Sequence, residues 1–221
     1  MARARRGEGT LMSRDNILHK VRTALGRSAG QPAPALAPPR LRVLPVDLET
    51  RLQSFSEALE ELAGKFYRAA SLEDARAYAA ALLGGKTAVA SSAALLRECG
   101  ITALDGVRSG VTEERELREL CARVDVGITS ADYALADTGT LVMFSSREEA
   151  RMISLLPPVH LAVVRTDRIL TGLDQLFTLE PLPGQRSSSM VLITGPSRTA
   201  DIEQILIRGV HGPGELHVVV I

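Results

Sequence analysis

The sequence has few of the residues on which several common kinds of protein depend. Its 221 residues include no tryptophan, and aromatic residues make up only 3% of them. Surfaces that stack nucleic-acid bases are built from aromatic side chains, so this scarcity disfavours such a surface. Neither sign of charge prevails, because 26 basic residues are matched by 26 acidic ones. We therefore expect no nucleic-acid partner.

Cysteines and long apolar runs are also scarce. The two cysteines, Cys99 and Cys121, are too few for a disulfide scaffold, a zinc knuckle or an iron–sulfur cluster, so we expect buried, reduced thiols and no metal site. No apolar run approaches the roughly 18 residues that span a bilayer. The basic first residues lead into glycine and glutamate rather than into the apolar stretch of a secretory signal. These absences predict a cytoplasmic protein without a membrane span.

Several widespread motifs are missing as well. The sequence contains no Gly-x-Gly-x-x-Gly after a strand, no Walker loop, no His-Glu-x-x-His and no Gly-x-Ser-x-Gly. Common dinucleotide-dependent dehydrogenases, P-loop enzymes, zinc proteases and serine hydrolases are therefore disfavoured.

What the sequence does have begins with an N-terminal arm. Residues 1–42 carry nine basic residues and two acidic ones. Ser13 is typical of a helix N-cap, and Gly26 is expected to end that helix after Leu25. Five of the 11 prolines fall between residues 32 and 45, which predicts an extended tether. We therefore divide the chain into residues 1–45 (basic arm, short helix and Pro-rich tether) and residues 46–221 (a folded domain).

The domain is predicted to alternate strands with helices. Helices are expected from about residues 47, 71, 93 and 112. The strand-like segments are residues 66–69, 87–90, 101–104, 124–129, 133–136, 140–145, 159–165, 190–194 and 216–221. This alternation favours a three-layer α/β/α fold with a mainly parallel sheet. The exception is residues 133–145, which are typical of a hairpin.

The turn of this hairpin is the first candidate for a functional site. The hydroxyls of Thr138 and Thr140 and the amide of Gly139 are suited to hold a phosphate or carboxylate, and Asp137 could act as acid, base or nucleophile. The alternative is structural, because Asp137 and Gly139 are also the residues that a tight turn needs.

A second candidate follows the apolar strand 190–194. Gly195 allows a ligand to approach the backbone closely, and Ser197, Arg198 and Thr199 offer donors to an anion. Asp201 is followed by Gln204, a spacing typical of a helix N-cap pair, which would explain Asp201 without any function.

The third candidate is the turn that contains His211 and Gly212. Glycines on both sides of His211 would let the turn direct its imidazole toward a site, although a single histidine is more often a structural hydrogen-bonding group. His160 lies inside an apolar strand, and we expect it to be a core histidine with its hydrogen bonds satisfied. Ligands collect at the carboxyl ends of strands in open α/β sheets, so we expect the three loops to share a cleft there.

Four segments of the chain together resemble the LUD-domain family of the lactate utilization protein C (LutC/YkgG) type. They read, in chain order, ADYALADTGTL (131–141), LLPPVH (155–160), ITGPSRTADIE (193–203) and GVHGP (209–213). The likeness extends from the helix at Ser13 to Ile221 and is densest after Gly127. Four motifs in this order are far more specific than any one of them.

This resemblance implies a fold, a pathway and partners. The family is similar to the NagB/RpiA/CoA-transferase-like α/β/α superfamily, whose CoA transferases use a glutamate in a loop comparable to that of Asp137. Its members belong to a three-protein system with which bacteria oxidise L-lactate to pyruvate, and the other two proteins carry iron–sulfur clusters. The resemblance thus implies a non-cluster subunit that binds a small anion and no cofactor, and it leaves open whether this chain catalyses a step alone.

Two other interpretations stay open on the sequence. The chain could be a free-standing enzyme that acts on a sugar phosphate, a folate or an acyl-CoA, with Asp137 as base or nucleophile and Arg198 as phosphate anchor. It could also be a regulatory binding module that docks a partner through the basic arm before Pro45.

Overall fold

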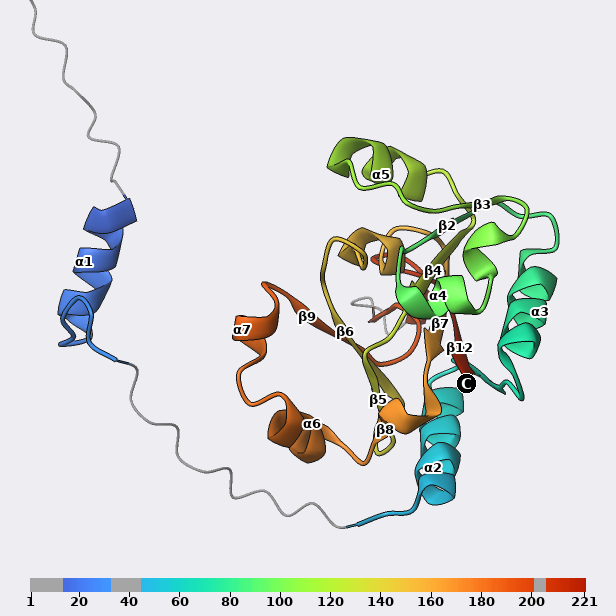
Figure 1. Ribbon diagram of the computed structural model, residues 1–221, viewed down its shortest axis with the longest axis horizontal. Helices are drawn as coiled ribbons and strands as arrows, with labels where there is room; N and C mark the ends of the chain where they lie inside the picture. Colours follow the sequence, from blue (N-terminus) through green and yellow to red (C-terminus); the bar gives the residue numbers. More distant parts are fainter. Residues whose placement is uncertain (1–13, 33–44, 201–205) are drawn as a thin grey trace, which may run out of the picture. The chain divides into compact units, whose positions relative to one another are not determined.

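A six-stranded sheet, in which every neighbouring pair of strands is parallel, forms the centre of the domain (Figure 1). The computed structural model describes residues 14–32, 45–200 and 206–221, and the chain divides into two compact units, residues 1–40 and 41–221. Across the sheet the strands are β1 (Lys65–Arg68), β12 (Glu215–Val220), β7 (Val159–Val164), β4 (Val126–Ser130), β2 (Ala88–Ala90) and β3 (Val107–Arg108). The predicted parallel sheet is confirmed.

Helices α3 (Leu72–Leu83) and α4 (Ala94–Glu98) cover one face of this sheet. The Ser71 side chain caps α3 by accepting a hydrogen bond from the Asp74 amide at 3.1 Å. The helix ends at Gly84, whose φ of 49° lies in the left-handed region. The buried side chains of both helices pack on those of β2, β4 and β7, as an amphipathic helix on a sheet requires.

A second sheet and helix α2 (Leu48–Glu61) cover the opposite face. Its strands, in order, are β8 (Ile169–Leu170), β5 (Tyr133–Leu135), β6 (Thr140–Phe144) and β9 (Met190–Ile193). The predicted hairpin is confirmed as the antiparallel pair of β5 and β6. That this hairpin joins β8 and β9 in a separate sheet was not predicted.

The remaining helices are short. They are α5 (Glu114–Cys121), α6 (Leu173–Leu179) and α7 (Pro183–Arg186), with the 3₁₀ turns η1 (Ile101–Ala103), η2 (Arg151–Ser154) and η3 (Thr166–Arg168). Within the described ranges, no helix is both long and apolar enough to cross a bilayer.

One expectation of secondary structure was wrong, and a second falls on residues that the structure does not describe. Residues 101–104 begin with the 3₁₀ turn η1 instead of a strand, because Gly100 takes a left-handed φ of 68° and turns the chain sharply after α4. A short antiparallel pair, β10 (Arg198–Ala200) and β11 (Leu206–Arg208), flanks the position where Asp201 and Gln204 indicated a helix start. Residues 201–205 themselves lie outside the described residues.

The smaller unit contains the predicted N-terminal helix, α1 (Arg14–Ala24). It ends before Gly26, whose φ is 63°, as the sequence indicated. Ile17 and Val21 on this helix and Leu25 just after it are all exposed. The predicted tether falls largely on residues 33–44, which lie outside the described residues, and the domain boundary at residues 45/46 stays a prediction.

The β5–β6 turn is fixed against the end of α2. Gly139 has a φ of 62°, and a Cβ built on it would lie 2.5 Å from the backbone nitrogen of Leu59. Only glycine can satisfy both the left-handed backbone and this close approach. Gly139 therefore joins the second sheet to α2.

We predict that Gly139→Ala lowers the free energy of unfolding by about 3 kcal/mol. The new methyl group would collide with the α2 backbone, and alanine at position 139 would have a strained, positive φ. Gly184→Ala is the matched control, since a Cβ there meets nothing within 4 Å. The control is expected to change stability by no more than about 0.5 kcal/mol. Urea unfolding of the two variants measures both values, and equal midpoints would contradict the proposed close packing.

Candidate functional site

A cavity of about 200 Å³ opens where β7 and β12 begin. Four of the predicted site residues line it, namely Gly195, Ser197, His211 and Gly212. They come from the loop after β9 and from the loop before β12, which are far apart in sequence. The structure therefore brings the second and third candidate loops together, as the sequence analysis expected.

Backbone hydrogen bonds hold these two loops side by side. The Ser197 amide donates to the Pro213 carbonyl at 2.8 Å, and the Gly209 amide donates to the Ser197 carbonyl at 3.0 Å. Gly195 and Gly209 take left-handed φ values of 87° and 79°, which lets each loop turn tightly at the cavity. The Ser197 side chain makes no recorded hydrogen bond to another described residue, which leaves its hydroxyl available to a ligand.

His160, on β7, also lines the cavity and is 1% exposed. Its Nε2 lies 2.8 Å from the Thr129 hydroxyl, but its Nδ1 is buried without a hydrogen-bond partner. Burial lowers the pKa of this imidazole to about 3, so the ring is neutral near pH 7. The expectation of a fully satisfied core histidine was therefore only half right, and the open Nδ1 makes His160 a candidate that the sequence analysis missed.

Arg198 lies at the edge of this site rather than within it. Its side chain is exposed, and its Nη2 is 3.6 Å from the position that a Cβ on Gly195 would occupy. Thr199 follows in β10, where its backbone pairs with that of Ile207, while its side chain lies outside the described set. Arg198 is thus close enough to Gly195 to reach an anion at the mouth of the cavity.

The hairpin residues Asp137, Thr138, Gly139 and Thr140 do not line this cavity. Asp137 is exposed and accepts a hydrogen bond from the Thr138 hydroxyl at 3.1 Å. Thr140 lies 2.8 Å, hydroxyl to hydroxyl, from Thr194, which does line the cavity. The hairpin is therefore a neighbour of the cavity and supports one of its walls.

The position of the cavity differs from the expectation. His160 and Leu216 are each the second residue of their strands, so the cavity lies at the amino ends of β7 and β12. We expected carboxyl ends, because Gly195 and Asp137 do follow strands. Those strands, β9 and β5, belong to the second sheet, in which β5 and β6 run antiparallel.

A different hollow of about 300 Å³ lies at the carboxyl ends of β4 and β7. It is lined by the last residue of β4, Ser130, by Arg165, which follows β7, and by Asp132, Arg168 and Arg186. These arginines belong to none of the sequence motifs described above. Arg165 and Arg168 come shortly after the apolar segment 159–164, and this position was the only feature of the sequence that could have indicated a binding role for them.

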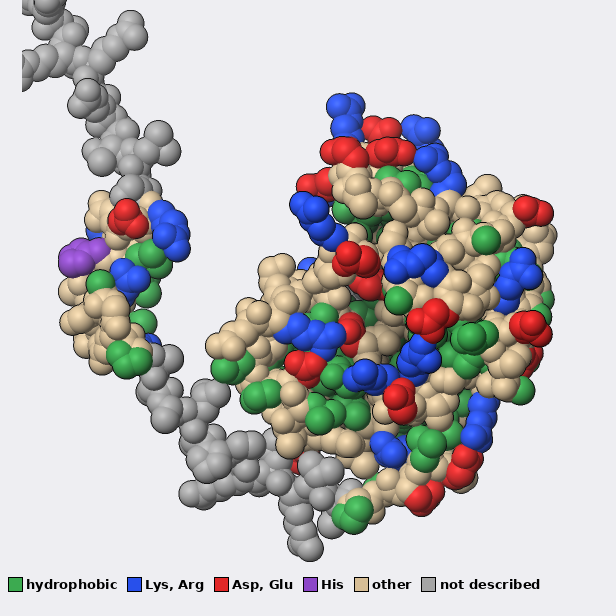
Figure 2. Space-filling view, in the orientation of Figure 1, with side chains coloured by type: hydrophobic (Ala, Val, Ile, Leu, Met, Phe, Trp, Pro, Cys, Tyr) green, Lys and Arg blue, Asp and Glu red, His purple; other side chains and the backbone are tan. Residues whose placement is uncertain are grey.

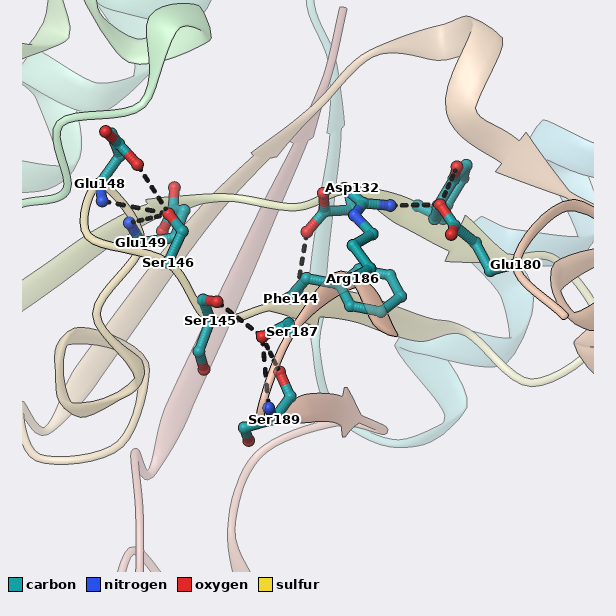
Figure 3. A network of polar contacts seen from close by, with 11 residues as sticks. Asp132, Phe144, Ser145, Ser146, Glu148, Glu149, Glu180, Arg186, Ser187 and Ser189 are labelled. Carbon is teal, nitrogen blue, oxygen red and sulfur yellow. Dashed lines mark hydrogen bonds and ion pairs between the residues drawn. The ribbon is translucent and has the colours of Figure 1, made fainter. Parts of the chain in front are cut away.

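Glu149 is a second residue that the sequence analysis missed (Figure 3). Its Oε1 accepts hydrogen bonds from the Ser91 hydroxyl at 2.6 Å and from the Ser130 amide at 2.7 Å, so it links the ends of β2 and β4. Its Oε2 is buried with no partner. Burial raises the pKa of this carboxyl to about 7.

Within the described residues, no group of three or more His, Cys, Asp and Glu side chains is placed to hold a metal ion. Cys99 and Cys121 are both buried free thiols, as expected. Burial raises the pKa of Cys121 to about 11, which keeps the thiol protonated near neutral pH.

Comparisons with known proteins agree with the motifs. The LUD domain family model matches residues 52–221. The uncharacterized protein YkgG of Escherichia coli is 30% identical over 220 residues, which cover 91% of this chain and 94% of that protein. The lactate utilization protein C of Halalkalibacterium halodurans is 40% identical over 106 residues, 46% of each chain. The alignments to the first curated relatives thus span about half of their length.

A solved structure is similar in fold. The crystal structure of a DUF162 family protein from Deinococcus radiodurans superimposes with a TM-score of 0.61 at 20% identity, covering 80% of this chain and 99% of that one. At this identity the likeness supports the α/β fold alone.

The pKa of Glu149 predicts how stability changes with pH. In the unfolded chain this carboxyl returns to its usual value of 4.5, so the folded state holds the proton to higher pH and loses stability as pH rises from 4.5 to 7. Glu149→Gln keeps the acceptor oxygen and removes the ionisation. We expect the variant to match the parent near pH 4 and to exceed it by about 3 kcal/mol near pH 8.

Chemical unfolding at both pH values measures this difference. Glu148→Gln, at the exposed neighbouring position, is the control and is expected to leave the pH dependence unchanged. A parent protein whose stability does not fall between the two pH values would contradict the burial of an ionisable Glu149.

Proposed function

Because the chain belongs to the LUD domain family, we propose that it is a component of a bacterial L-lactate utilisation system and that it binds a small carboxylate anion in the cavity at the amino ends of β7 and β12. The observation that carries the pathway is the 40% identity to a relative named lactate utilization protein C. The binding role rests on the cavity itself.

The cavity has the chemistry that a short 2-hydroxycarboxylate needs. Its walls include the apolar side chains of Leu155, Val191 and Leu216, against which a methyl group would pack. The unpartnered Nδ1 of His160 and the hydroxyl of Ser197 would hydrogen-bond the ligand's hydroxyl. A buried polar atom without a partner costs free energy, and a ligand that pairs with it recovers that cost.

The carboxylate of such a ligand would lie at the mouth of the cavity. Arg198 offers a guanidinium beside Gly195, and His211 and the Gly212 backbone lie on the facing loop. Charge-assisted hydrogen bonds from a guanidinium to a carboxylate are stronger than neutral ones and favour a fixed orientation. Thr199 follows Arg198 in β10 and would add its backbone to this rim.

The hairpin carries the supporting part of the proposed site. The Thr140–Thr194 contact would fix the wall on which the ligand rests, with Thr138 donating to Asp137 and Gly139 holding the turn against α2. Asp137 does not line the cavity, so it would contact only a ligand that extended past Thr194. We therefore place binding at His160, Ser197 and Arg198, with Asp137 as the candidate carboxylate next to it.

We further propose that the redox chemistry takes place on partner proteins. The resemblance to the lactate utilization system implies two iron–sulfur proteins that oxidise L-lactate to pyruvate together with this chain. Their clusters would accept the electrons, and this chain would contribute the binding of the anion and bind no cofactor of its own.

Calorimetric titration of the full chain with L-lactate tests the binding role. Arg198→Gln is expected to weaken binding about tenfold, because one charge-assisted hydrogen bond is lost. Arg123→Gln removes the same charge from an exposed position with no recorded side-chain partner, and its affinity is expected to equal that of the parent. If parent and Arg198→Gln bind equally, or if the parent does not bind, L-lactate is not the ligand of this cavity.

Deletion of the gene from its host tests the pathway. We expect the strain to lose growth on L-lactate and to keep growth on pyruvate, and we expect the tagged protein to purify from lactate-grown cells with two cluster-bearing proteins. Unchanged growth on L-lactate, in a strain that lacks a second copy of the gene, would overturn the assignment.

A further inference from the structure

We propose that the hollow at the carboxyl ends of β4 and β7 is a separate binding site for a small oxyanion, a phosphate or carboxylate group, held by Arg165, Arg168 and Arg186. This proposal is independent of the lactate cavity, because the two hollows share no lining residue. It assigns a role to the part of the sheet where ligands of open α/β proteins bind.

The hollow is large enough for such a group and is built at the edge of the central sheet. Its volume is about 300 Å³, and it extends from Ser130 at the end of β4 to Arg165 after β7. Helix α4 contributes Leu95 and Glu98 to the opposite side. Figure 2 shows Lys and Arg side chains gathered among acidic ones on the face between α4 and α7.

Arg186 is held in place before any ligand arrives. Its guanidinium bonds to both Asp132 and Glu180 and lies 4.0 Å from the centroid of the Phe144 ring (Figure 3). The two recorded ion pairs occupy two of the five N–H groups that a guanidinium offers. The side chain remains 39% exposed and lines the hollow, so an anion there can approach its remaining donors. An arginine fixed in this way loses little conformational entropy when it binds an anion.

The carboxylates that fix Arg186 are themselves anchored. Asp132 accepts a hydrogen bond from the Phe144 amide at 2.7 Å, and Glu180 accepts one from the Tyr133 hydroxyl at 2.9 Å. The acidic groups therefore position the guanidinium and are not free to fold into the hollow. Glu98 pairs with Arg165 in the same manner on the other side.

Arg168 is the guanidinium of the hollow that carboxylates leave free to bind an anion. Its guanidinium lies 5.6 Å from the centroid of the Tyr133 ring, the same ring that Arg186 approaches at 6.0 Å. In the described part of the chain, Arg168 has no recorded ion pair. The carboxylates at the hollow are already engaged by the other two arginines: Glu98 pairs with Arg165, and Asp132 and Glu180 pair with Arg186. A bound oxyanion would give Arg168 a charged partner and bridge neighbouring guanidinium groups.

The test is a titration of the ¹⁵N-labelled full chain with inorganic phosphate, followed by NMR. We expect the backbone amides of Ala131, Asp132 and Arg168 to shift and that of Gly212, at the lactate cavity, to stay in place. Arg168→Gln is expected to weaken phosphate binding about tenfold. Arg165→Gln is the second variant. Arg123→Gln, at an exposed position before β4, whereas the hollow lies where β4 ends, is the control with unchanged affinity.

A parallel titration with citrate separates the two sources of the anion. Tighter binding of phosphate than of citrate would indicate a phosphorylated ligand, and the reverse would indicate a carboxylate ligand. Binding is expected to weaken as salt is added, since the hollow is exposed to solvent.

The proposal fails if neither anion shifts these amides, or if Arg168→Gln and Arg165→Gln both bind like the control. Thermal unfolding of each variant shows that the fold is intact, so a loss of binding cannot be ascribed to unfolding. A negative phosphate titration would not affect the proposal that L-lactate binds in the cavity beside Arg198. A negative L-lactate titration would likewise not affect the proposal that an oxyanion binds at Arg168.

Discussion

The burial of β7 on both faces is the constraint on which the rest of the domain depends. All six of its residues are buried, and among the described strands it pairs with β12 on one side and β4 on the other. Because a buried backbone must find its partners in adjacent strands, the register of these three strands is fixed. That register sets His160 at one end and Arg165 at the other, about 16 Å apart at the usual rise per residue of a strand. Two hollows of different chemistry therefore open at the two ends of one strand.

The fold could be predicted well from local patterns, because each pattern had a direct physical cause. The apolar run at 159–164, the Ser71 cap and the left-handed Gly84 act within a few residues, and the structure has β7 and α3 where these signals indicated. The four motifs predicted the family, and the family match over residues 52–221 confirms it. The second sheet could not be predicted, because the pairing of β6 with β9 joins segments about fifty residues apart and depends on packing against α2.

The candidate site was predictable only where short loops carried it. Gly195, Ser197, His211 and Gly212 were chosen for their turns, and the backbone bonds between Ser197, Gly209 and Pro213 bring them together. The role of His160 depends on which of its ring nitrogens lies beside the Thr129 hydroxyl, and no sequence pattern predicts that contact. The arginine hollow could not be predicted from the sequence either. Arg186 lies at the end of α7, and only the fold brings it beside Arg165 and Arg168.

The two hollows differ in the way they would bind an anion. One is mainly apolar and contains a neutral imidazole whose Nδ1 has no partner, and the other is lined by guanidinium groups, two of which carboxylates already hold in place. A crystal structure of the protein grown with both L-lactate and phosphate tests this account most directly. It predicts lactate beside Nδ1 of His160 and phosphate beside Arg168, in the same molecule. Crystals that hold only water in both places at saturating ligand would contradict it.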